Sequence, residues 1–142
     1  MYSGLKVAEY VLFWHYKNGT GISNFKLQKV LYFIQAEFLV VCGHPAFANS
    51  IEAWEFGPVV SEVYMKYAVY GGCGIPYINK PYYTSITEKH RKLIDGVLEQ
   101  CEGLSSVALT DLTTNQSPWQ DTFTPNRHEV IPNNKIREYF LN

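Results

Sequence analysis

The pattern of hydrophobic and polar positions is clearest after residue 23, where the chain reads NFKLQKVLYFIQAEFLVV. Ser23 or Asn24 can supply the N-cap of a helix, and the apolar run stops just before Gly43. Cap residues at the start and a glycine at the end are typical of helix boundaries. The pattern therefore predicts one long helix from the cap to about Cys42.

The charged and polar positions of this predicted helix lie on two opposite sides. With about 100° between successive residues, Lys26, Lys29 and Glu37 form one narrow charged stripe, and almost every other position is apolar. We therefore expect a central helix that is covered on most sides. Gln28 and Gln35 lie opposite the charged stripe. Because a buried amide without partners costs about 1–3 kcal/mol, we expect both glutamines to bind backbone groups of a neighbouring segment, or else to line a surface that a partner covers.

Shorter patterns predict the other elements. Further helices are expected at residues 5–16, 58–70 (with Pro58 in the first position), 88–101, 105–112 and 133–140 (with Ile136, Tyr139 and Phe140 facing inward). Short strands are expected at residues 51–56, near 77–84 and at 130–131. The predicted fold class is mainly α: a single compact domain over residues 1–142, with about five to six helices around a central buried helix and a small β element.

Composition and charge argue against several classes of protein. The chain has 142 residues with 12 Lys+Arg against 13 Asp+Glu, so it lacks the basic excess of a dedicated nucleic-acid binder. No apolar stretch approaches 18 residues, which argues against a membrane span. Cys42, Cys73 and Cys101 form no CxxC pair, which fits a reducing compartment better than a disulfide framework. We expect a cytoplasmic protein.

The sequence has no recognisable catalytic, cofactor or metal motif. None of the four histidines has a second ligand at helical metal-site spacing, and His44, just before a proline, suits a turn better than a ligand role. Neither a nucleophile elbow nor a phosphate-binding loop is present. Glu52 and Glu55, three residues apart, would point to opposite faces of a strand. We expect no enzyme, no cofactor and no metal site, although a small enzyme with a cleft near Gln28 and Glu55 stays an alternative.

Three motifs in this order resemble those of a known family. They are LQKVLYF at residues 27–33, IEAWEFGPVV at residues 51–60 and Pro118-Trp119. Together they are similar to the Panacea domain of the SocA-like antitoxin family, which includes phage-associated GepA-type proteins. The resemblance extends over residues 5–140. Two positions depart from the family pattern: Ser61 stands where many relatives have proline, and Gln120-Asp121 stand where a basic residue often follows Pro-Trp.

The resemblance implies a small, mostly helical antitoxin that neutralises a cognate toxin by direct binding. One relative is a proteolytic adaptor that delivers its toxin to the ClpXP protease, so a ClpXP-type protease is a second expected partner. A phage-associated interaction domain outside any toxin pair is the alternative. We expect Trp54 and Phe56 to fill the core and Gly57-Pro58 to form a sharp turn from strand to helix. The residues expected around a functional cleft are Gln28, Lys29, Tyr32, Glu55 and Trp119.

Overall fold

A central helix, α2, organises the computed structural model, which describes residues 1–78 and 84–142. The described residues form seven α-helices, one 3-10 helix and three short strands. In chain order the elements are α1 (Gly4–Lys17), α2 (Asn24–Val41), β1 (Ile51–Trp54), β2 (Gly57–Val59), α3 (Ser61–Tyr67), the 3-10 helix η1 (Ala68–Tyr70), α4 (Glu88–Glu102), α5 (Ser106–Thr114), α6 (Ser117–Gln120), β3 (Glu129–Ile131) and α7 (Asn133–Leu141). The mainly α prediction is confirmed.

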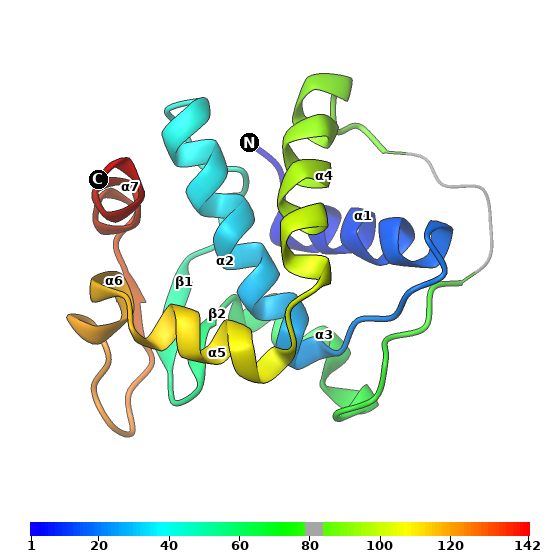
Figure 1. Ribbon diagram of the computed structural model, residues 1–142. Helices are drawn as coiled ribbons and strands as arrows, with labels where there is room; N and C mark the ends of the chain where they lie inside the picture. The colour runs from blue at the N-terminus through cyan, green and yellow to red at the C-terminus, as the bar shows by residue number, and fades with distance from the viewer. Residues whose placement is uncertain (79–83) are drawn as a thin grey trace.

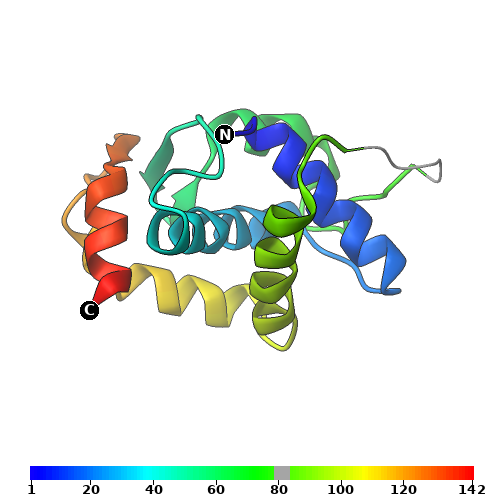
Figure 2. The ribbon, with the colours of Figure 1, turned by 90° about the horizontal axis from the view of Figure 1, so that it is seen from above.

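Helix α2 begins and ends where its cap residues predict. Ser23 Oγ accepts a hydrogen bond from the backbone N–H of Lys26, and Gly43 follows the helix with a φ of 76°. Helices α1, α3, α4, α5 and α7 and strand β2 all pack on α2. Figure 1 shows α2 between α7 and α4, and Figure 2 shows the same arrangement from above. The expected central buried helix is therefore present.

Both glutamines of α2 bind backbone groups of neighbouring segments, as predicted. Gln28 Oε1 accepts a hydrogen bond from the N–H of Val60 at 3.0 Å. Gln35 Oε1 accepts from the N–H groups of Ala46 and Phe47 at 2.8 and 3.2 Å, and its Nε2 donates to the Phe47 carbonyl at 3.1 Å. These bonds join the segments before and after the β1–β2 hairpin to the central helix.

The charged stripe of α2 does not stay together at the surface. Lys29 is only 1% exposed, whereas Lys26 and Glu37 are half-buried. Lys29 is buried because strand β2 packs over this part of α2. A Cβ built on Gly57 would lie 3.4 Å from Lys29 Cε. A helical wheel gives the side of the helix on which Lys29 lies, but not the strand that covers it.

The β element is a three-stranded antiparallel sheet in the order β2-β1-β3. The predicted strand at residues 51–56 is shorter, and β3 confirms the strand expected at residues 130–131. The expected helical role of Pro58 is wrong, because Pro58 lies in β2, opposite Ala53. Proline has no N–H to donate, and β2 lies at an edge of the sheet, where such a residue is tolerated. Helix α3 starts only at Ser61.

The strand expected near residues 77–84 is not found in the described chain. Tyr77 and Ile78 are irregular, and residues 79–83 lie outside the described residues. The hairpin partner of β1 is instead the adjacent β2. A two-residue turn is enough to pair β1 with β2.

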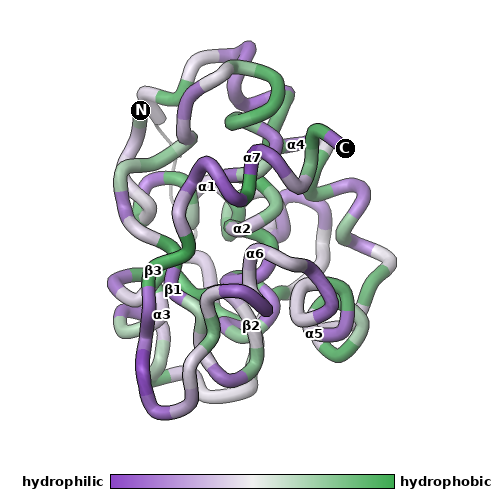
Figure 3. Tube along the Cα trace, turned by 90° about the vertical axis from the view of Figure 1, so that its left-hand side faces the viewer, coloured by the Kyte–Doolittle hydropathy of each residue, from purple (hydrophilic) through white to green (hydrophobic). Residues whose placement is uncertain are grey.

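Helix α4 buries one apolar face, and the inward face predicted for α7 is confirmed only in part. Ile94, Val97, Leu98 and Cys101 are all buried. In α7 Ile136 is buried, but Tyr139 is 38% exposed. Figure 3 shows hydrophobic positions along α2, in the middle of the molecule. No helix among the described residues is both long enough and apolar enough to cross a membrane.

Candidate functional site

The turn between β1 and β2 forms one side of a pocket with a volume of about 300 Å³. We call it the hairpin pocket. Its lining comes from four parts of the chain: the start of α2, the β1–β2 hairpin, α3 and the loop before β3. The lining residues are Phe25, Gln28, Lys29, Trp54, Glu55, Phe56, Val59, Tyr64, Phe123, Asn126, Arg127 and His128. The pocket therefore includes Gln28, Lys29, Trp54 and Glu55 of the residues singled out in the sequence.

Lys29 supplies the buried positive charge of the hairpin pocket. Its Nζ lies 3.7 Å from the centre of the Phe25 ring and donates a hydrogen bond to the Phe25 carbonyl at 3.3 Å. No carboxylate forms an ion pair with it in residues 1–78 and 84–142. Burial lowers the pKa of Lys29 to about 8, because it removes water from the charged ammonium group. The side chain is still mostly protonated at neutral pH and can attract an acceptor group that enters the pocket.

Aromatic rings form the wall around this charge. Trp54 stacks on His128 with ring centres 4.0 Å apart and an interplanar angle of 11°. The Trp54 ring also contacts Tyr64, at 5.0 Å between centres. On the other side, Phe56 lies 5.7 Å from Phe25. The wall therefore presents flat apolar surfaces of the kind on which protein interfaces depend.

Neither Trp54 nor Phe56 fills the core as expected. Trp54 is half-buried in the pocket wall, and Phe56 is 60% exposed. Phe56 and Glu55 form the two-residue tip of the hairpin, where the chain reverses and side chains project beyond the sheet. An exposed phenylalanine at a hairpin tip contributes little to the core but is available to a partner.

Gly57 is required by the backbone at this tip. Its φ is 126°, and an added Cβ would lie 3.1 Å from Thr113 Oγ1. A side chain at this position would strain the backbone and push against α5. The expected sharp turn from strand to helix at Gly57-Pro58 is wrong: both residues lie in β2, and the chain reverses one step earlier, at Glu55-Phe56, from strand to strand.

Trp119 supports the pocket from outside its lining. Its indole Nε1 donates a hydrogen bond to the Trp54 carbonyl at 2.8 Å, and its ring stacks on Phe123 at 4.6 Å. Trp119 thus connects the pocket wall on β1 with the loop before β3. Tyr32 lies apart from the pocket: it is fully buried and donates to Gln116 Oε1 at 2.7 Å. Burial raises the pKa of the Tyr32 hydroxyl, which therefore stays protonated as a donor.

Sequence reasoning missed the loop that completes the pocket, which contributes Phe123, Arg127 and His128. The signal for it was the predicted strand at residues 130–131. Because β3 pairs with β1 so that Glu129 lies opposite Ala53, the preceding residue His128 falls beside Trp54. The sequence predicted both strands but not their pairing, and only the pairing brings this loop to the hairpin.

The chain matches a known protein family. Residues 27–120, well over half of the chain, match the family described as Antitoxin SocA-like, Panacea domain. The chain belongs to the SocA-like antitoxin family. The family match includes the whole β1–β2 hairpin and α2 from Leu27 onward, Lys29 among them, but not the loop before β3.

Sequence similarity to a named relative is consistent with the family match. One is Antitoxin SocA of Caulobacter vibrioides (strain NA1000 / CB15N), which is 48% identical over 50 residues. That match includes 35% of this chain and 27% of the relative, so the chain spans well under half of the relative's length. No solved structure matches the chain. Family membership supports an antitoxin role.

Proposed function

We propose that residues 1–142 act as one cytoplasmic antitoxin domain that neutralises a cognate toxin by binding it directly at the hairpin pocket. The observation that supports the pocket most strongly is the exposed Phe56 beside the buried charge of Lys29. Hot spots of interfaces are aromatic or arginine anchors that fill pockets and are surrounded by a polar rim. Here Trp54 and Phe56 are the anchors, and Arg127 and Glu55 lie at the rim.

The chemistry of the pocket defines the toxin group that fits it. A volume of about 300 Å³ is at the lower end for ligand sites and suits one or two side chains of a protein partner. The aromatic wall favours an apolar body, and the Lys29 ammonium favours a carboxylate or carbonyl at its end. We therefore expect the toxin to insert an apolar side chain together with an acceptor group.

Replacing Phe56 by alanine is expected to weaken toxin binding by tenfold or more, about the effect of losing an interface anchor. The fold should not change, because Phe56 is 60% exposed. The measurement takes the product of the adjacent gene as the expected toxin, purifies it alone and titrates it with the antitoxin to obtain the Kd. The same variant should fail to rescue growth when both proteins are co-expressed.

Val107→Ala is the matched control for this measurement. Val107 is 70% exposed on α5 and does not line the hairpin pocket, so its Kd should equal that of the wild type. If Phe56→Ala binds the toxin with the same Kd as the wild type, the hairpin pocket is not the toxin-binding site. An adjacent gene product that is harmless when expressed alone would instead contradict the antitoxin function and favour the phage-associated interaction domain.

Direct sequestration and delivery to a ClpXP-type protease predict different lifetimes for the toxin. We expect sequestration, so the half-life of the toxin in cells that contain the antitoxin should not change when the protease gene is deleted. The half-life is measured after protein synthesis is stopped. A toxin that becomes several-fold longer-lived without the protease would assign the adaptor role instead.

The alternative of a small enzyme near Gln28 and Glu55 gains little support. The Gln28 amide is occupied, since it donates to Asn24 Oδ1 and accepts from Val60 N–H. Glu55 is exposed at the hairpin tip. General acid or base catalysis needs groups that converge on one substrate atom, and these two residues do not provide them.

A further inference from the structure

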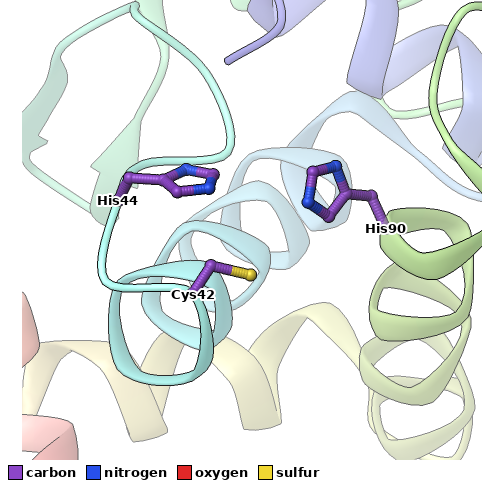
Figure 4. A group of neighbouring side chains, drawn as sticks. All are labelled: Cys42, His44 and His90. Carbon is purple, nitrogen blue, oxygen red and sulfur yellow. The ribbon is translucent and has the colours of Figure 1, made fainter.

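Three potential metal ligands, none of which lines the hairpin pocket, meet where the end of α2 approaches the start of α4. They are Cys42, which caps the C-terminus of α2, His44 in the loop that follows, and His90 in the first turn of α4. One ligand atom from each lies within 4.8 Å of the other two. Figure 4 shows the Cys42 sulfur and the two imidazole rings directed toward one shared space.

The hydrogen bonds of His44 leave one ring nitrogen available. His44 Nδ1 lies 2.9 Å from the Pro45 carbonyl oxygen. Because a carbonyl oxygen only accepts, Nδ1 must carry the proton in this bond, and Nε2 of the neutral ring keeps its lone pair. A donated N–H from the opposite ring nitrogen is the usual outer contact of a metal-binding histidine.

His90 has a similar outer contact from the N-terminal segment. Its Nδ1 lies 2.7 Å from Tyr2 Oη, and Tyr2 Oη also accepts the backbone N–H of Thr87 at 3.2 Å. A phenolic oxygen has a second lone pair, which can accept the Nδ1 proton of His90. The Nε2 lone pair of His90 is then free for a cation. The Phe38 ring, 5.0 Å from His90 and 6.4 Å from His44 between centres, packs against both imidazoles.

We propose that Cys42, His44 and His90 bind Zn²⁺, with water as the fourth ligand. Donor atoms of a tetrahedral zinc site lie about 3.3–3.6 Å apart, since Zn–S is about 2.3 Å and Zn–N about 2.0–2.1 Å. The ligand atoms all lie within 4.8 Å of one another, so side-chain rotations that bring them together by roughly 1 Å would complete this geometry. The thiol gives up its proton to solvent as the zinc–thiolate bond forms, and no electron is transferred. His44 is exposed, so water can reach the fourth position.

Zinc at this position would tie α2 to α4 through residues nearly fifty positions apart in the chain. A metal that binds only the folded state stabilises that state. The site is independent of the toxin and of the hairpin pocket, so its test does not depend on the proposed function. This cluster was not predicted from the sequence, because no two of its ligands lie at the spacing of a metal-binding helix.

The test begins with full-length protein that has been stripped with a chelator and kept reduced. Co²⁺ is the optical probe, since a thiolate ligand gives a sulfur-to-cobalt charge-transfer band and a tetrahedral site gives strong visible bands. We expect both sets of bands to saturate at one Co²⁺ per chain and to disappear when Zn²⁺ is added. At a Zn²⁺ concentration of about 100 times the Kd, the Tm should rise by about 8 °C.

Substitutions then separate metal binding from folding. Cys42→Ser and His90→Gln should each lower the Zn²⁺ affinity by at least about 100-fold, and Tyr2→Phe by about tenfold through the loss of the outer contact. Cys73→Ser is the matched control, because Cys73 is exposed and outside the cluster. Circular dichroism of the metal-free variants checks that each one folds. The absence of the cobalt bands in the wild type, or equal Zn²⁺ affinity of Cys42→Ser and wild type, would overturn the proposal.

Discussion

Replacing Gln35 by leucine is expected to lower the free energy of unfolding by about 4 kcal/mol. Gln35 is 0% exposed, and its amide binds the N–H groups of Ala46 and Phe47 and the carbonyl of Phe47. Leucine has nearly the same size but leaves these three buried backbone groups without their partner. Each unsatisfied buried group costs about 1–3 kcal/mol, and the additional apolar burial of leucine offsets part of the sum.

Urea denaturation followed by circular dichroism measures this change. Gln100→Leu is the matched control, because Gln100 is exposed on α4, and its free energy of unfolding should change by less than about 0.5 kcal/mol. A Gln35→Leu protein as stable as the wild type would mean that water or a shifted backbone satisfies the segment before β1.

Replacing Lys29 by methionine is expected to change how stability depends on pH. The pKa of Lys29 is about 8 in the folded protein and 10.5 for an ordinary lysine. Because the folded pKa is the lower one, the unfolded chain binds more protons between these two values, and the wild type gains stability as the pH rises through this window. The buried charge thus costs about 3 kcal/mol at neutral pH, and the cost fades toward pH 10.5.

The comparison between variant and wild type isolates this effect from other titrating groups. The stability of the wild type relative to Lys29→Met should increase by about 2 kcal/mol from about pH 7 to about pH 9.5. Lys66→Met, at an exposed position on α3, is the control. Parallel pH profiles of Lys29→Met and wild type would show that the Lys29 ammonium is not desolvated in solution.

The Lys29 ammonium lowers stability at neutral pH, and it lies at the site proposed to bind the toxin. A hydrophobic residue at position 29 would suit the covered face of α2 better than a lysine. Buried groups with shifted pKa values are concentrated at functional sites, and Lys29 lies in the lining of the hairpin pocket. We therefore expect Lys29→Met to combine higher stability at neutral pH with weaker toxin binding, whereas Gln35→Leu weakens the fold itself.

The sequence by itself determined the elements whose signals are local. The apolar pattern between Ser23 and Gly43 predicted α2 and its central position, because cap residues and helical periodicity act within a few residues. The two glutamines were correctly expected to bind backbone, since a buried amide must find partners whatever the fold. The three ordered motifs were sufficient to indicate the SocA-like family, which the family comparison confirms.

Only the tertiary structure decided which distant residues meet. The burial of Lys29 depends on β2. This strand was not predicted, because glycine followed by proline also suits the start of a helix. The hairpin pocket needs β3 beside β1, and the cluster of Cys42, His44 and His90 needs α4 beside the end of α2. Such pairings depend on packing between segments far apart in the chain, and a local pattern contains no information about that distance.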